Sequence, residues 1–334
     1  MYPNRNRSGS PRSLAAMRLG LAAIAALTLT PAAAAAKAAV GAETPARSAD
    51  ATHFRYLTVR GIRIFYREAG DPTKPTILLL HGFPASSHEF RDLIPLLSRR
   101  FHVVAPDYPG FGLSDAPPPA AFRATFADLA KVMEGFVSAA GIRRYTIYMH
   151  DFGGPVGFRL ATAHPEMVEG LVVQNANAYE EGIAPDVLRD MRERARGPLD
   201  AAGSASLERM LSPDGTRFQY LTGAPDPSRV DPTSYGLDSS LQAVPDRHRI
   251  QRSLIVDYAD NVRLYPEWQA YLRRYRPRTL IVWGRNDPIF LPAGASAYLA
   301  DLPRAEVRMI DAGHFTLEED APEIGRLILA FHPR

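Results

Sequence analysis

The sequence predicts an α/β fold built on a mostly parallel, eight-stranded sheet with helices on both faces. From about residue 56, short β-branched runs alternate with longer helical patterns, which is typical of such a sheet. The runs at residues 78–80 and 280–282 are wholly apolar, as expected of strands buried on both faces. A hydrophobic fraction of 46% and a charged fraction of 22% fit a globular protein with a real core.

The alternation divides the chain into expected strands and helices. Strands are expected at residues 56–60, 62–68, 76–80, 102–105, 146–149, 170–174, 279–283 and 306–310. Helices are expected at residues 89–99, 126–140, 154–163, 292–300 and 321–331. The sheet and its helices would therefore occupy residues 52–177 and 277–334.

Residues 178–276 interrupt the alternation. They contain helical patterns, such as residues 186–196 and 251–258, and no convincing parallel strand. An insertion after the sixth strand would cover the carboxyl ends of the strands, where open α/β sheets bind ligands. We expect a helical cap, or lid, over an active site; the alternative is a separate helical domain without a catalytic part.

The N-terminal segment has the pattern of a secretory signal. Four arginines precede or enter an apolar run at residues 19–30, which is followed by Pro31 and a series of alanines. The run is shorter than the roughly 20 residues that span a bilayer. We expect a cleaved signal peptide over residues 1–37, with Met17 as an alternative start, a linker over residues 38–51, and an exported protein, periplasmic or secreted. An uncleaved anchor is the alternative, and no stable membrane insertion is expected after cleavage.

The formal charge of +3 does not indicate a nucleic-acid partner. Residues 1–37 hold four arginines, Lys37 and no acid, so the rest of the chain carries 34 basic residues (39 − 5) against 36 acidic ones. The arginines at residues 273–278 are interpreted as a solvated helix end, because no aromatic stacking surface accompanies them. The absence of cysteine excludes disulfides, thiolate catalysis and cysteine metal sites.

The clearest chemical signal is the sequence Met-His-Asp-Phe-Gly-Gly at residues 149–154, where a strand pattern meets a helical one. A sharp turn between strand and helix exposes its central side chain, and the positive helix N-terminus and backbone N–H groups face that side chain. Gly153 is small, as such a turn requires, whereas Met149 stands where a first glycine is usual. We predict Asp151 as a nucleophile; a helix cap is the alternative.

Two further side chains follow strands that should end at the same edge of the sheet. Asp287 comes directly after the strand expected at residues 279–283, and His314 directly after the last strand. A nucleophile, an acid and a histidine at three strand ends predict a catalytic triad. The backbone N–H of Phe83, in His-Gly-Phe-Pro at residues 81–84, would join that of Phe152 in an oxyanion hole.

Several neighbouring polar residues are interpreted as structural. His81 is expected to brace its own loop, and residues 107–114 to form a tight loop after the fourth strand. His150 and Asp115 are interpreted in the same way.

Taken together, the motifs at residues 81–84, 150–154, 283–287 and 313–315 resemble those of the epoxide hydrolase and haloalkane dehalogenase branch of the α/β-hydrolase superfamily. The resemblance covers about residues 52–334 and implies the α/β-hydrolase fold, whose chain order is nucleophile, acid, histidine. It matches the insertion more loosely.

A carboxylate nucleophile predicts the type of substrate. Attack on an ester would leave a reactive anhydride, so Asp151 suits displacement at a saturated carbon in a small, apolar, electrophilic substrate. An alkyl ester on Asp151 would form, and water activated by His314 and Asp287 would hydrolyse it. This chemistry requires no cofactor and no metal.

The resemblance leaves two leaving groups to consider. Related epoxide hydrolases protonate the ring oxygen with two lid tyrosines, for which Tyr220 and Tyr258 are the choices here and Tyr265 a close rival. Related dehalogenases hold halide with a tryptophan and often an asparagine at the positions of Phe152 and Phe83, which have no side-chain donor. Epoxide opening is therefore predicted. A dehalogenase for haloalkanes or haloacids, with Asn175 or Trp268 as donor, is the alternative, and a non-catalytic binding protein a lesser one.

Overall fold

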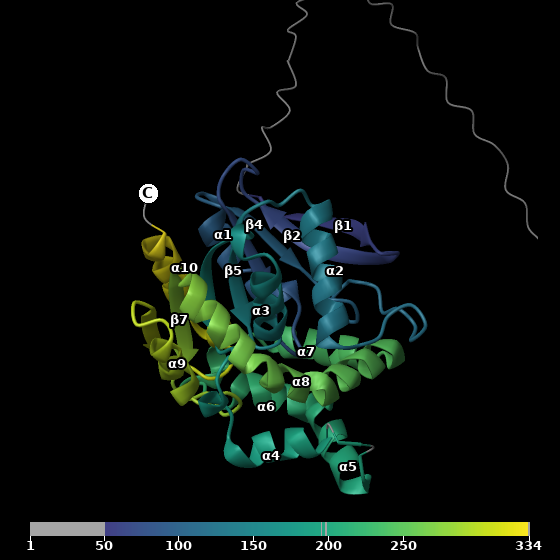
Figure 1. Ribbon diagram of the computed structural model, residues 1–334. Coiled ribbons are helices and arrows are strands. Elements are labelled where there is room, and N and C mark those ends of the chain that lie inside the picture. The colour runs from purple at the N-terminus through teal and green to yellow at the C-terminus, as the bar shows by residue number, and fades with distance from the viewer. Residues whose placement is uncertain (1–50, 195, 198, 333–334) are drawn as a thin grey trace, which may run out of the picture. The chain divides into compact units, whose positions relative to one another are not determined.

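An eight-stranded sheet forms the centre of the computed structural model, which describes residues 51–194, 196–197 and 199–332 (Figure 1). Its strands lie in the order β1-β2-β4-β3-β5-β6-β7-β8. β2 pairs antiparallel with β1 and β4, and all other pairs are parallel. The strands are β1 (His53–Val59), β2 (Ile62–Ala69), β3 (Thr76–Leu80), β4 (His102–Pro106), β5 (Tyr145–His150), β6 (Val168–Gln174), β7 (Thr279–Gly284) and β8 (Glu306–Ile310).

Helices cover both faces of the sheet, and the alternation of side chains along β3 shows how. Leu78 and Leu80 pack in one apolar cluster with α2 (Phe126–Ala139) and α3 (Gly153–Ala163). Ile77 and Leu79 pack in a second cluster with α1 (Leu93–Ser98) and α10 (Thr316–Phe331). This two-sided burial is what a wholly apolar strand requires. The predicted fold class, a mostly parallel α/β sheet of the hydrolase type, is confirmed.

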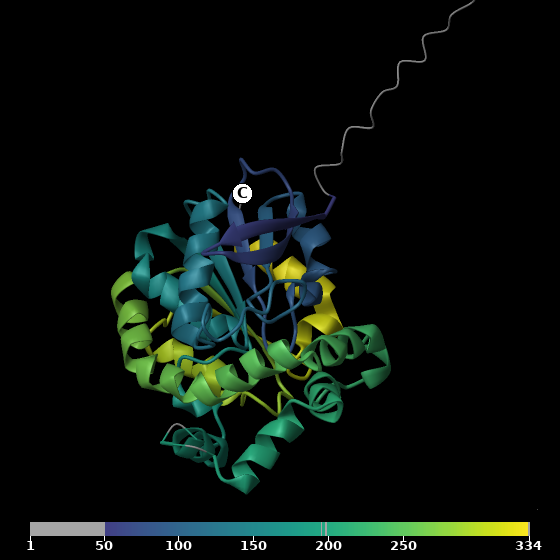
Figure 2. The same ribbon diagram turned by 90° about the vertical axis from the view of Figure 1, so that its right-hand side faces the viewer.

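The helical insertion lies between β6 and β7. Figure 1 and Figure 2 both show its helices gathered below the sheet, with α8 running across the whole core. The described part of the insertion contains no strand. Its helices are η3 (Glu180–Gly182), α4 (Pro185–Arg194), α5 (Ala201–Met210), α6 (Pro213–Leu221), η4 (Pro227–Arg229), α7 (Pro232–Gln242) and α8 (Pro245–Tyr275).

The predicted helix at residues 251–258 is part of the much longer α8, which has 31 residues. Pro266 lies inside α8, where it removes one backbone donor and disfavours the helix. The helix continues past it because Tyr258, Tyr265, Trp268 and Leu272 are all buried along one side.

Three other predicted helices differ in their bounds. The helix expected at residues 89–99 is a short turn, η1 (Ser87–Phe90), followed by α1. The one expected at residues 292–300 is α9 (Ala293–Ala297) continued by η5 (Tyr298–Ala300). α10 begins five residues before the predicted start at residue 321 because two helices join across a kink at Asp320. A short turn, η2 (Pro165–Met167), precedes β6.

The predicted signal peptide lies outside the described residues, as does the linker up to residue 50. Within the described part of the chain, no helix is both long and apolar enough to cross a membrane.

Candidate active site

Asp151 occupies the sharp turn between β5 and α3. Its backbone has a φ of +48°, a conformation that few residues other than glycine adopt. A Cβ atom on Gly153 would lie 2.2 Å from the carbonyl oxygen of Leu80, so this position must remain glycine. Met149, at the other side of the turn, is fully buried, and its Cε lies against Gly157. The larger first residue is therefore accommodated by a glycine one turn into α3.

The structure brings Asp151, Asp287 and His314 together. Nδ1 of His314 lies 2.9 Å from Oδ2 of Asp287, and Nε2 lies 3.8 Å from Oδ2 of Asp151. All three side chains are buried, and Nε2 of His314 has no hydrogen-bond partner in the described protein. This nitrogen therefore lies beside the carboxylate of Asp151 without a hydrogen bond to it.

The second oxygen of Asp287 is also fixed. Oδ1 accepts hydrogen bonds from the backbone N–H groups of Ile289 at 2.7 Å and Phe290 at 3.1 Å. Asn175 also binds Asp287, since its Nδ2 donates to Oδ2 of Asp287 at 2.6 Å. From the sequence, Asn175 was predicted only as an alternative halide donor. Asn175 follows β6 directly, and β6 is the neighbour of β7, which precedes Asp287. This position could have indicated a contact with Asp287.

The two backbone donors of the predicted oxyanion hole lie at Asp151. The N–H of Phe83 donates to Oδ1 of Asp151 at 2.7 Å. The N–H of Phe152 also interacts with this carboxylate. Oδ1 is thus held by the backbone, whereas Oδ2 faces His314.

Burial and neighbouring charge oppose each other at the two central groups. Burial raises the pKa of Asp151, although His314, His150 and the two N–H groups favour its charged form. Burial also lowers the pKa of His314, but the carboxylates of Asp287 and Asp151 outweigh it, so this pKa lies above its ordinary value. A loss of negative charge at Asp151 would consequently lower the pKa of His314.

Of the three predicted lid tyrosines, Tyr220 already has a partner. Its hydroxyl donates to the buried carboxylate of Asp238 at 2.5 Å. Its ring stacks on Phe315, with centroids 3.7 Å apart. Tyr220 therefore packs beside the histidine loop with its hydroxyl engaged.

Tyr258 and Tyr265, both on α8, have buried hydroxyls with no hydrogen-bond partner among the described residues. The hydroxyls interact with each other without the geometry of a full hydrogen bond. The ring of Tyr258 packs against Phe152 and Phe290, with centroids 5.9 and 6.1 Å away. The charge of Asp151 acts on both tyrosines. Two buried hydroxyls without a hydrogen-bond partner among the described residues thus lie within range of the charge of Asp151.

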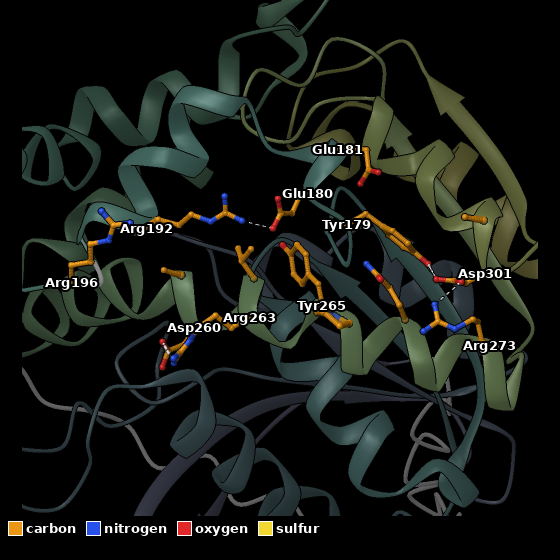
Figure 3. Close-up of a pocket in the computed structure, with 15 residues that line it drawn as sticks. Tyr179, Glu180, Glu181, Arg192, Arg196, Asp260, Arg263, Tyr265, Arg273 and Asp301 are labelled. Carbon is orange, nitrogen blue, oxygen red and sulfur yellow. Dashed lines mark hydrogen bonds and ion pairs between the residues drawn. The ribbon is translucent and has the colours of Figure 1, made fainter.

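Tyr265 also borders a pocket of about 1120 Å³ between η3, α4 and α8 (Figure 3). Two ion pairs stand in its wall, one from Arg192 to Glu180 at 2.5 Å and one from Arg273 to Asp301 at 2.9 Å. The pocket is therefore lined mostly by polar and charged side chains, and Tyr265 contributes an aromatic ring to its wall.

The residues interpreted as structural make hydrogen bonds within their own and neighbouring loops. Nε2 of His81 accepts from the N–H of Tyr108 at 3.1 Å, and burial lowers the pKa of His81 to about 3, so it remains neutral. Asp107 accepts from the N–H groups of Ser87 and Leu113, both at 2.7 Å. The described part of the chain contains no group of three or more His, Asp or Glu residues that could hold a metal ion.

The backbone before His314 is held by a further acid, Glu319, whose Oε1 accepts from the N–H of Gly313 at 2.7 Å. Burial raises the pKa of Glu319 to about 7. Because the folded pKa lies above the unfolded one, folding takes up a proton between pH 4.5 and 7, and stability falls as pH rises through this window.

A Glu319→Gln variant should keep the acceptor and lose this pH dependence. We expect its melting temperature to equal that of the parent near pH 4 and to exceed it by a few degrees at pH 8. Thermal unfolding followed by circular dichroism across this range tests the expectation. A variant less stable than the parent at pH 8 would show that the charged carboxylate stabilises the loop.

Comparison with known proteins places these observations in a family. Residues 75–321 match the family model for the alpha/beta hydrolase fold. The uncharacterized hydrolase YNR064C of Saccharomyces cerevisiae is 41% identical over 272 residues, 81% of this chain and 93% of that protein. Haloalkane dehalogenase 2 of Mycobacterium tuberculosis is 29% identical over 275 residues, 78% and 88% of the two chains.

Solved structures agree on the fold. The crystal structure of the haloalkane dehalogenase DbeA from Bradyrhizobium elkani has a TM-score of 0.68 at 22% identity, and the match covers 84% of this chain and 97% of that one. The chain belongs to the alpha/beta hydrolase fold family and is a hydrolase.

Proposed function

We propose that the protein opens epoxides to vicinal diols through a covalent ester on Asp151. The observation that carries this proposal is the pair of free tyrosine hydroxyls, Tyr258 and Tyr265, beside a carboxylate in the nucleophile position. A carboxylate suits attack on saturated carbon, and a strained ring oxygen needs a proton donor as its bond to carbon breaks.

In the first half-reaction, Oδ2 of Asp151 attacks one ring carbon. Oδ1 is held by Phe83, so Oδ2 is the oxygen free to react. The new bond joins Oδ2 to carbon, the carbon–oxygen bond of the ring breaks, and the ring oxygen takes the proton of Tyr258 or Tyr265. The product is a hydroxyalkyl ester whose carbonyl oxygen is Oδ1.

In the second half-reaction, His314 activates water. Nε2 has no hydrogen-bond partner among the described residues and lies 3.8 Å from Oδ2 of Asp151, so it is available to accept a proton from water. The imidazole takes one proton, and the hydroxide adds to the carboxyl carbon of Asp151. The N–H groups of Phe83 and Phe152 then hold the negative charge on Oδ1. Collapse breaks the bond between Oδ2 and the substrate carbon and releases the diol, whose new hydroxyl takes the proton from His314. Asp151 is left as a carboxylic acid, and the proton that it loses balances the one that the tyrosinate regains through solvent.

The helical insertion would act as the lid of this site. Both free tyrosines come from α8, and the triad beneath them is buried. The charged pocket outside Tyr265 would be the route by which the substrate approaches. Excluding bulk water strengthens the hydrogen bonds on which both half-reactions depend.

Dehalogenation of haloalkanes or haloacids is the second candidate, favoured by the 29% identity to haloalkane dehalogenase 2. One of the two candidate halide donors, Asn175, is engaged elsewhere. Nδ2 of Asn175 donates to Asp287, and its Oδ1 accepts from the N–H of Gly284 and the hydroxyl of Thr316. The ring of Trp268 stacks on Phe158 under Arg159. Epoxide opening therefore fits the site better.

A panel of epoxides and haloalkanes tests the two functions directly. The purified protein should form diols from some of the epoxides and release no halide from the haloalkanes. Halide release without diol formation would show that the protein is a dehalogenase and would overturn the proposal. Inactivity towards a broad panel of both classes would argue against attack at saturated carbon altogether.

Replacing Tyr258 with phenylalanine should slow ester formation by about 100-fold, because one of two proton donors is removed from the leaving oxygen. Stopped-flow measurement of the first turnover gives this rate. The matched control is Tyr220→Phe, which removes a hydroxyl engaged by Asp238, and its rate of ester formation should change by less than about 3-fold. A larger effect in Tyr220→Phe than in Tyr258→Phe would assign the donor to α6 instead.

A further inference from the structure

We infer that Glu89 and His150 form a second acid–histidine pair, which shares one proton and positions His314 through its backbone carbonyl. This inference rests on the proposed role of His314 as the base that hydrolyses the ester. It assigns no contact with substrate to either residue, so both are positioning residues.

The pair lies directly behind the candidate base. Nδ1 of His150 is 3.1 Å from Oε2 of Glu89, and Nε2 of His150 is 3.2 Å from the carbonyl oxygen of His314. The rings of His150 and His314 are 5.0 Å apart. All three side chains are buried. These contacts therefore connect Glu89 on η1, His150 at the end of β5 and the loop that contains His314.

Counting protons fixes the tautomer of His150. A carbonyl oxygen only accepts, so Nε2 must carry the hydrogen that is donated to His314. Nδ1 then either accepts a proton from a neutral Glu89 or carries its own and faces a charged Glu89. A bare Nδ1 against a charged carboxylate would place two lone pairs together. In either allowed form the pair holds one shared proton and has no net charge.

The surroundings favour the form in which Glu89 is the carboxylic acid. Its second oxygen, Oε1, is buried and has no hydrogen-bond partner in the described protein. An ionised carboxylate with one bare oxygen would be costly there. Burial raises the pKa of Glu89, and the charges of Glu318 and Asp151 raise it further against the opposing effect of His150. Glu89 thus donates its proton to Nδ1 of His150.

This pair completes a set of contacts that fix the candidate base on three sides. Asp287 holds its ring, Glu319 holds the preceding N–H at Gly313, and His150 holds its carbonyl. The nitrogen that must take a proton from water has no partner of its own, so its position depends on these contacts. A displacement of about 1 Å can cost about 100-fold in rate.

Two substitutions of similar size separate positioning from simple stability. Glu89→Leu removes the donor to Nδ1 and should slow hydrolysis of the ester by about 10- to 100-fold, with ester formation little changed. The ester should therefore accumulate, as intact-protein mass spectrometry would detect. Glu89→Gln keeps an N–H donor that cannot ionise, and should restore hydrolysis to within about 3-fold of the parent.

The outcomes distinguish the inference from its alternatives. Slow hydrolysis in Glu89→Gln equal to that in Glu89→Leu would show that a charged carboxylate is needed, and would overturn the inference. Unchanged hydrolysis in folded Glu89→Leu would overturn it as well. A loss of ester formation together with a lower melting temperature would assign the pair a purely structural role.

A measurement on the parent protein tests the pair without any substrate. Nitrogen-15 spectra of histidine-labelled protein, with His150 assigned by a His150→Gln variant, should show Nε2 protonated and Nδ1 bare near neutral pH. A protonated Nδ1 would show that Glu89 is ionised and would overturn the assignment of the shared proton to Glu89. If no substrate ever forms an ester while His150 has the expected tautomer, the proposed function fails and the proton assignment stands.

Discussion

Asp151→Ala should lower the rate of diol formation by at least about 10⁴-fold, because the variant has no group that can form the ester. The backbone N–H groups of Phe83 and Phe152 remain in place, but the variant lacks the carboxyl group whose negative charge they would stabilise. Turnover assays and intact-protein mass spectrometry under single-turnover conditions provide the two readouts. The parent should show a transient mass increase equal to one substrate, and the variant none.

A second aspartate provides the matched control for this substitution. Asp115 is half exposed, accepts from the backbone of Arg63 and lies outside the triad. Asp115→Ala should retain diol formation within about 3-fold, since surface substitutions usually have small effects. Turnover in Asp151→Ala within 10-fold of the parent would mean that another group, or water activated directly, attacks the substrate.

The candidate triad could be predicted from the sequence because each member is marked locally. Asp151, Asp287 and His314 each follow a strand whose apolar pattern is visible, and parallel strands bring their carboxyl ends to one edge. The order of these strands in the sheet was not needed. The same reasoning places Phe83, since its loop follows the neighbouring strand β3.

The roles of the tyrosines in the helical insertion could not be predicted in this way, because these residues differ only in their partners. Tyr220 is engaged because α6 packs on α7, which presents Asp238 to it. Nothing within a few residues of Tyr220 indicates this contact. The hydroxyls of Tyr258 and Tyr265 have no hydrogen-bond partner among the described residues. Their local sequence does not indicate this either.

Some local signals in the insertion were nevertheless available. Ser212 and Asp231 cap α6 and α7 with their side chains, and each is followed by a proline at the first helical position. This pattern marks a helix start. Pro266 in α8 shows the opposite case, where an apparent stop signal is overridden by burial of the helix face.

His314→Gln should stop the reaction at the ester. Glutamine cannot take a proton from water at neutral pH, and removing a general base slows the step by about 10²- to 10⁴-fold. Ester formation uses Asp151 and the tyrosines, so it should continue. Mixing the variant with an epoxide should therefore leave a stable mass increase of one substrate per protein, with the added mass on the peptide that contains Asp151.

The matched control is His164→Gln, a partly exposed histidine paired with Glu134, which should turn over like the parent. In the proposed reaction, the change of charge in the site accounts for the use of His314 in the second half-reaction only. Before attack, the carboxylates of Asp287 and Asp151 hold the pKa of His314 above its ordinary value and favour the protonated ring. Forming the ester removes the charge of Asp151, which lowers that pKa and frees Nε2 to accept a proton from water.

The rate of ester hydrolysis should accordingly fall as pH is lowered. The pKa that governs this fall should be lower than the pKa that NMR titration gives for His314 in the free protein. Equal values would mean that ester formation does not alter the charge next to the base, and that Asp151 is not the group that carries the ester.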